Sequence, residues 1–192
     1  MTRLVLFITH AEVVIDPAIP VPDWPLSPEG RRRHEVFNRS GAIARLSAIF
    51  SSQERKATDA AAILSAATGL PVTRVRDLHE NDRSATGFLP AVEFEGVADA
   101  FFADPHVGVR GWERAVDAQA RIVAAMERVM ARAPAGGIVV VAHGAVGALY
   151  LCHLKACAIS RSEDQPPTRG GNVFTFERDS RRLLGGWRSI DA

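Results

Sequence analysis

The segment LVLFITHAE, residues 4–12, decides the fold. Its first five residues form a continuous apolar run, which is typical of a strand that is covered on both faces. The run ends at Thr9 and His10, so polar side chains begin where the strand stops. A second run, IVVVA at residues 138–142, leads in the same way into His143. The sequence therefore predicts two buried strands, each with a histidine at its carboxyl end.

Helical patterns alternate with these strands. Prolines predict a loop over residues 16–28, and Ser27, Pro28 and Glu29 then provide the capping residue, first-turn proline and acid of a helix start. We expect helices over residues 28–46, 56–67, 91–102, 112–132 and 146–157, and further strands over residues 48–51, 72–75, 173–176 and 183–187. This alternation favours an α/β fold, a three-layer α/β/α sandwich with a mostly parallel central sheet. One domain over residues 1–192 is expected, because a chain of this length buries one good core.

The two histidines are placed where ligands bind in such folds. In parallel sheets, ligands collect at the carboxyl ends of strands, where backbone amides and helix amino termini converge. A single histidine at a strand end is as often a hydrogen-bonded structural residue as a functional one. The matched positions of His10 and His143 favour a functional site.

Composition excludes several classes of protein. The chain has 23 Lys and Arg residues against 22 Asp and Glu residues, a net charge of +1, so no global field attracts nucleic acid or an anionic membrane. The five apolar residues before Thr9 are too few for a signal peptide or a membrane span, and we expect a cytoplasmic location. Cys152 and Cys157 match no metal-binding or disulfide pattern, and we expect both to be reduced and buried.

Five short motifs carry a resemblance to a known family. In chain order they are Thr9-His10-Ala11-Glu12, Pro25-Leu26-Ser27 with Gly30, Ser51-Ser52 with Lys56-Ala57, Leu78 with Glu80, and His143-Gly144. Together they resemble the histidine phosphatase (phosphoglycerate mutase-like) superfamily along nearly the whole chain. The resemblance implies a phosphoglycerate mutase-like fold and a phosphomonoesterase that uses no metal or other cofactor.

The resemblance also implies roles for individual residues. His10 is the expected nucleophile that forms a phosphohistidine, and Glu80 the expected general acid and base. Neutral imidazole is a competent nucleophile near pH 7, and a carboxyl group can donate a proton to the leaving alkoxide. His143 is expected to balance charge on the phosphoryl oxygens. The expected substrate-binding residues are Thr9, Glu12, Lys56, Arg55 and Gly144.

The chain departs from the family pattern at the phosphate-binding positions. Arginine is expected before the nucleophilic histidine and at a second position, where this chain has Thr9 and Lys56. Arginine holds two phosphate oxygens with a planar fork, whereas lysine is a point charge and threonine is neutral. The phosphate pocket is therefore expected to lack one positive charge. Candidates to replace it are Arg55, Arg83 and Arg169.

Three functions are compatible with these residues. The first is a phosphatase acting on a small phosphorylated metabolite or a phosphoprotein; a mutase is disfavoured, because residues 81–111 leave little chain for a lid. The second is a catalytically weak or inactive relative that binds an anion or a partner protein, favoured by the two missing arginines. The third is a metallohydrolase, but the chain has no closely spaced histidine pair to start a metal site. Its candidate ligands are His10, Glu12, His79, Glu80 and His143.

Overall fold

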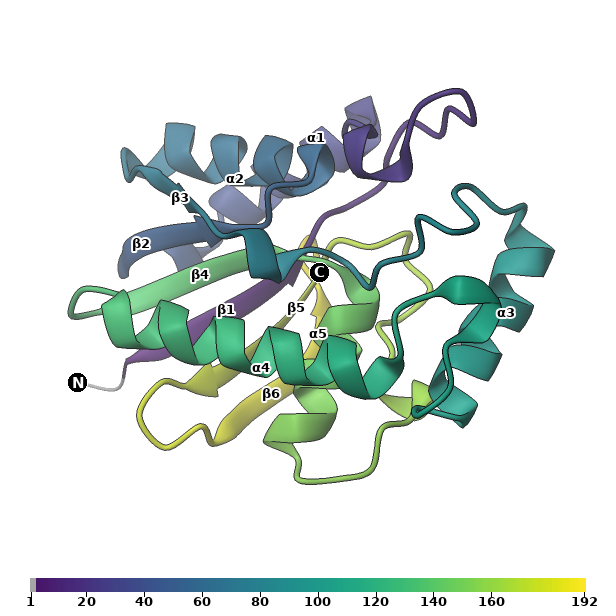
Figure 1. Ribbon diagram of the computed structural model, residues 1–192. Coiled ribbons are helices and arrows are strands. Elements are labelled where there is room, and N and C mark those ends of the chain that lie inside the picture. The colour runs from purple at the N-terminus through teal and green to yellow at the C-terminus, as the bar shows by residue number, and fades with distance from the viewer. Residues whose placement is uncertain (1–2) are drawn as a thin grey trace.

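The computed structural model describes residues 3–192 and contains one six-stranded sheet (Figure 1). The strands are β1 (Leu4–Thr9), β2 (Leu46–Ser51), β3 (Val72–Arg74), β4 (Gly137–Ala142), β5 (Asn172–Glu177) and β6 (Leu183–Ser189). They lie in the order β3-β2-β4-β1-β5-β6. The first four are mutually parallel, and β5 is antiparallel to both β1 and β6. The mostly parallel sheet predicted from the sequence is confirmed.

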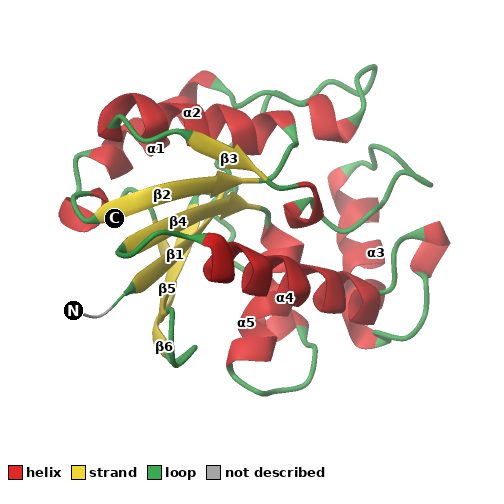
Figure 2. Cartoon of the chain, turned by 60° about the vertical axis from the view of Figure 1, so that its left-hand side comes forward, coloured by secondary structure: helices red, strands yellow, loops and turns green. Residues whose placement is uncertain are grey.

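Helices cover both faces of the sheet. They are α1 (Pro28–Asn38), α2 (Arg55–Thr68), α3 (Ala91–Ala103), α4 (Ala115–Arg132) and α5 (Gly144–Leu154). Figure 1 shows α1 and α2 on one face and α4 and α5 on the other, which confirms the three-layer sandwich. Helix α3 lies apart from these layers, on the side toward which the arrows of the parallel strands point (Figure 2).

The two central strands are apolar throughout because both of their faces are buried. In β1, Val5 and Phe7 belong to the core shared with α4 and α5, whereas Leu6 and Ile8 belong to the core shared with α1 and α2. Successive side chains of a strand point to opposite faces, so a strand between two helix layers needs an unbroken apolar run. This requirement explains the LVLFI segment.

Several element boundaries differ from the prediction. Helix α1 ends at Asn38 rather than near residue 46, because Ser40 and Gly41 begin a short turn of 3-10 helix over residues 41–43. Helix α5 ends at Leu154 rather than 157, and Ala156 has a positive φ of 51° that no helix continues through. The prediction that Cys157 is buried is wrong, since its turn leaves it exposed; Cys152 is buried, and both are free thiols.

The described part of the chain begins at Arg3. The expectation that the amino-terminal segment is neither a signal peptide nor a membrane span includes Met1 and Thr2, which lie outside the described residues. Within residues 3–192, no helix is both long and apolar enough to cross a bilayer.

Candidate active site

His10 and His143 meet at the carboxyl ends of two adjacent strands. Thr9 of β1 lies opposite Ala142 of β4, so the residue that follows each strand emerges at the same edge of the sheet. The backbone N–H of His10 donates to the carbonyl oxygen of Ala142 at 3.1 Å. The two imidazole rings have centroids 5.2 Å apart. Neighbouring parallel strands therefore bring together two residues that are far apart in the sequence.

His10 is held in one tautomer. Its Nδ1 lies 2.9 Å from the carbonyl oxygen of Ala11, which can only accept a hydrogen bond, so Nδ1 carries the proton. The Nε2 atom then has a free lone pair. Burial, followed by the nearby His143 and Lys56, lowers the pKa of His10 well below its ordinary value, so the ring is neutral near pH 7. A neutral imidazole with a free Nε2 is the form that attacks an electrophile.

His143 is fully buried beside this ring. Its Nε2 lies 2.9 Å from the hydroxyl of Ser52 and 3.5 Å from Oε1 of Glu54. Burial lowers the pKa of His143 to about 3, although the Glu54 carboxylate opposes this shift. The ring is therefore neutral near pH 7, and it can offer a hydrogen bond to an anion but no positive charge.

Glu54 is a site residue that the sequence analysis missed. Its Oε2 lies 2.5 Å from Nζ of Lys56, and both side chains are nearly inaccessible, at 10% and 3% exposed. Lys56 also donates to the carbonyl oxygen of Val21 at 2.8 Å. The predicted phosphate-binding lysine is thus paired with an acid inside the protein. The signal for Glu54 was its position two residues before Lys56 within the recognised motif.

The side chain of Glu80 contacts the amino terminus of helix α5. Its carboxylate accepts hydrogen bonds from the backbone N–H groups of Ala145 at 3.3 Å and Val146 at 3.1 Å. The same side chain lines the cavity in which His10 is exposed. The structure therefore brings Glu80, His10 and the amino terminus of α5 to one cavity.

This cavity has a volume of about 440 Å³ and walls of two kinds. One wall is apolar and comes from α3 and the segment before α4; it contains Phe94, Phe101, Phe102 and Trp112. The other wall carries charge. Its arginines are Arg83, Arg161 and Arg169.

The arginines of the charged wall differ in their partners. Arg161 is paired with Glu95 and Asp99, and Arg169 lies 3.0 Å from Glu12. Arg83 forms no ion pair with any residue from 3 to 192, and its guanidinium stacks on Phe94 at 4.9 Å from the ring centroid. Arg83 is therefore the cation of this wall that is available to an incoming anion.

Comparison with known proteins identifies the family. The model of the histidine phosphatase superfamily (branch 1) matches residues 6–185. The chain belongs to the histidine phosphatase superfamily. A search of curated protein sequences found no significant match.

Solved structures of similar fold agree with this family. A mycobacterial glucosyl-3-phosphoglycerate phosphatase in complex with inorganic phosphate is 21% identical with a TM-score of 0.78, covering 99% of each chain. The YhfR protein of Bacillus stearothermophilus is 21% identical with a TM-score of 0.80, covering 95% of each chain. A putative alpha-ribazole-5'-P phosphatase of Escherichia coli is 13% identical with a TM-score of 0.71, covering 100% of this chain and 97% of that chain. At these identities the likeness concerns the fold.

In this member of the histidine phosphatase superfamily, Thr9 does not line the cavity of His10. Its hydroxyl donates to Oε1 of Gln165 at 2.8 Å and accepts from the backbone N–H of Asn172 at 2.9 Å. The side chain is 1% exposed. The residue in place of the expected arginine therefore joins β1 to β5 and to the preceding loop.

The other predicted substrate-binding residues are dispersed. Glu12 is bound to Ser27 and Arg169, and Arg55 is an exposed first residue of α2. Gly144 lines the cavity, and it lies so close to the amide of Gln165 that a Cβ there would collide with it. Of the five predicted substrate-binding residues, Gly144 is the one that lines the cavity of His10.

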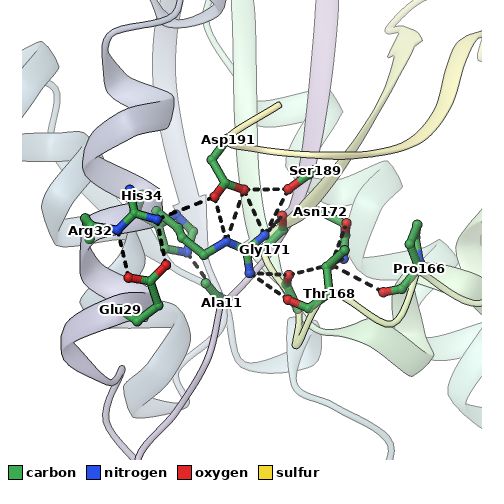
Figure 3. Close-up of polar contacts among 12 residues, drawn as sticks. Ala11, Glu29, Arg32, His34, Pro166, Thr168, Gly171, Asn172, Ser189 and Asp191 are labelled. Atoms are coloured by element: carbon green, nitrogen blue, oxygen red, sulfur yellow. Dashed lines mark hydrogen bonds and ion pairs between the residues drawn. The ribbon is translucent and has the colours of Figure 1, made fainter.

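The loop over His10 is held by a buried arginine. Arg33 donates to both carboxylate oxygens of Asp191, at 3.0 and 3.1 Å, and to the carbonyl oxygens of Thr168, Gly170 and Gly171. Figure 3 shows Asp191, Ser189, Thr168 and Gly171 close to one another, with Ala11 and His34 beside them. Three consecutive arginines at residues 31–33 of a helix are typical of a solvated face, but Arg33 is only 6% exposed. No local pattern distinguishes it from its exposed neighbours, because its partners are more than 130 positions away.

The alternative metal site finds no support in the arrangement of ligands. Over residues 3–192, no three His, Cys, Asp or Glu side chains are grouped so as to hold a metal ion. His79 directs its Nδ1 to the carbonyl oxygen of Glu80 at 2.7 Å. Although His79 and Glu80 are adjacent in the sequence, they are not part of a group of three possible metal ligands among the described residues.

Proposed function

We propose that this chain hydrolyses a phosphomonoester through a phosphohistidine on His10. The observation that carries the proposal is the free Nε2 of a neutral His10 at a cavity that also exposes Glu80. Nε2 attacks phosphorus in line, and the bond from phosphorus to the leaving oxygen breaks. Glu80 gives its proton to that oxygen. Water then attacks the phosphohistidine, Glu80 takes the proton of the water, and inorganic phosphate leaves with His10 restored.

Charge on the phosphoryl oxygens needs donors that are already in place. Arg83 supplies a guanidinium without a carboxylate partner, and His143 supplies a neutral N–H. Lys56 contributes its charge from beneath the site, reduced by its pairing with Glu54. Arg83 thus takes the part of the arginine that the family pattern places before the nucleophile.

The cavity favours a small substrate with an apolar face. Its volume of about 440 Å³ is that of a small-molecule site, and its apolar wall is formed by phenyl and indole rings. The similar structures include phosphatases named for glucosyl-3-phosphoglycerate and alpha-ribazole phosphate, both small phosphorylated molecules. An aryl phosphate is therefore a suitable first substrate.

The second candidate function is anion binding without turnover. It is favoured by the pairing of Lys56 with Glu54, which leaves the buried layer of the site without net positive charge. Loss of one oriented donor costs roughly 10²- to 10³-fold in rate at an anion-stabilising site. A relative of this kind binds phosphate but releases no product.

Hydrolysis of an aryl phosphate, in the presence of a chelator, tests the proposal. We expect turnover in the natural protein, none with His10→Ala, and unchanged turnover with His106→Ala, since His106 is exposed and lies outside the cavity. Rapid quenching in alkali with radiolabelled substrate is expected to recover label on the natural protein, because phosphohistidine forms before water attacks. A folded protein that binds phosphate, yet is inactive and takes up no label, would identify the non-catalytic relative instead.

A further inference from the structure

Glu54 sits where an anion would be expected to bind. Its Oε2 contacts Nζ of Lys56 at 2.5 Å, and its Oε1 lies 3.5 Å from Nε2 of His143. Oε1 also accepts the backbone N–H of Glu80 at 2.9 Å. One carboxylate therefore occupies a cation and an amide, two of the kinds of group that bind phosphoryl oxygens, and it lies beside the imidazole of His143.

The position of Glu54 in its helix does not explain this arrangement. Glu54 is the N-cap residue of α2, yet its side chain makes no capping hydrogen bond to that helix. An acid at an N-cap commonly binds the free amides of the first turn. Here the carboxylate contacts the side chain of Lys56 and the backbone N–H of Glu80 instead of the free amides of α2, so these contacts belong to the site rather than to the helix end.

The carboxylate is ionised at every pH at which the protein would work. Burial alone would raise the pKa of Glu54, but His143 and Lys56, together with the hydrogen bonds from Lys56 and Glu80, hold this pKa far below its ordinary value. Its charge and that of Lys56 cancel. Lys56 and Glu54 adjoin His143 and do not line the cavity of His10, so the cation next to that cavity is already paired with another anion.

We propose that the carboxylate of Glu54 competes with the phosphoryl group of the substrate for the same donors. It holds Lys56 and the backbone N–H of Glu80, and a substrate gains these donors only by displacing the carboxylate. The inference rests on the proposed function for the identity of the anion. The consequence is selectivity: inorganic phosphate binds weakly, and phosphomonoesters bind well only when their leaving group also contacts the apolar wall.

Binding of inorganic phosphate to Glu54→Gln tests this inference. The amide keeps the size of the side chain and an oxygen acceptor for the N–H of Glu80, but it removes the charge. We expect the dissociation constant for inorganic phosphate, measured by calorimetry near pH 7, to fall roughly 10- to 100-fold. The matched control is Glu35→Gln on the exposed face of α1, which is expected to leave that constant unchanged.

A weaker or unchanged affinity in folded Glu54→Gln would overturn the inference, because it would mean that Glu54 only orients Lys56. If this variant does not fold, Glu54→Asp serves in its place. The shorter side chain keeps the charge but no longer reaches both Lys56 and His143, and tighter phosphate binding is again expected.

Because binding is measured without turnover, failure of the inference and failure of the proposed function are distinguishable. Turnover in the natural protein with no gain of phosphate affinity in Glu54→Gln would reject the inference alone. A gain of affinity in a protein that hydrolyses no phosphomonoester would support the inference and reject the proposed function.

Discussion

The backbone N–H of Gly171 donates a hydrogen bond of 2.8 Å to the carbonyl oxygen of His10. This bond joins the loop before β5 to the candidate nucleophile. Gly170, the preceding residue, has a φ of +74° and faces the same oxygen so closely that a Cβ at this position would collide with it. Glycine at position 170 is therefore required both by its backbone conformation and by the approach of the loop to His10.

Gly170→Ala is expected to destabilise the protein and to reduce turnover, and Gly69→Ala provides a matched control. Gly69 has a similar φ of +72°, but a Cβ there would meet nothing within 4 Å. Both substitutions should cost about 1 kcal/mol for the left-handed backbone. Gly170→Ala should cost more, because the methyl group also displaces His10. Urea unfolding and aryl phosphate turnover measure both effects; equal losses in the two variants would show that the loop adapts without moving His10.

Arg33→Met is expected to reduce the free energy of unfolding by about 3 kcal/mol, because it leaves Asp191 and three carbonyl oxygens without their buried partner. Arg32→Met is the control, since Arg32 has a side chain 54% exposed, pairs with Glu29 on the surface and reaches Asp191 only at 3.9 Å. Urea denaturation compares the two. A loss below about 0.5 kcal/mol in Arg33→Met would mean that the loop is held by its own backbone contacts.

The fold was predictable because its signals are local. The apolar runs lie within β1 and β4, and the residue after each strand is the histidine of the site. Strand pairing then follows from the parallel sheet, which places His10 beside His143. The end of α1 was predicted too late, because a polar helix and the loop that follows it have similar composition.

The parts of the site that were missed depend on contacts between distant segments. Gln165 binds Thr9 across 156 positions, and the partners of Arg33 lie at the opposite end of the chain. Periodicity contains no information about such pairs. Glu54 is different, because it lies inside the motif of Ser51, Ser52 and Lys56. Its importance follows from the burial of Lys56, and a charged residue at a helix start is not expected to be buried.

Buried neutral histidines predict a loss of stability in mild acid. Burial, followed by the nearby His10 and Arg33, lowers the pKa of His34 to about 3, and its Nε2 accepts the backbone N–H of Ala11 at 3.2 Å. In the unfolded chain this pKa is about 6.5. Below about pH 6.5, His34 is therefore protonated in the unfolded state but not in the folded state. The free energy of unfolding that is present above this pH decreases as the pH falls toward the pKa of His34 in the folded protein.

His34→Gln tests this prediction. Once the unfolded state is protonated, each such histidine should reduce the free energy of unfolding by about 1.4 kcal/mol per pH unit. In the variant, the free energy of unfolding should therefore change less steeply with pH, by about that amount, between roughly pH 6 and pH 5. Exposed His106→Gln is the control. Urea unfolding at several pH values gives the slopes, and an unchanged slope in His34→Gln would show that His34 is protonated in the folded protein.

The leaving group should reveal the role of Glu80. Ala145 and Val146 donate to different oxygens of Glu80, so Glu80→Gln keeps an oxygen acceptor for one of the two amides but has no proton to give a leaving alkoxide. General acid catalysis contributes roughly 10²- to 10⁴-fold, and it matters most when the leaving oxygen is strongly basic. We therefore expect kcat to fall by about that factor for an alkyl phosphate, and by much less for a nitrophenyl phosphate, whose leaving group departs without a proton. An equal fall for both substrates would assign Glu80 to the positioning of α5, since a change in geometry affects attack on phosphorus whatever group leaves.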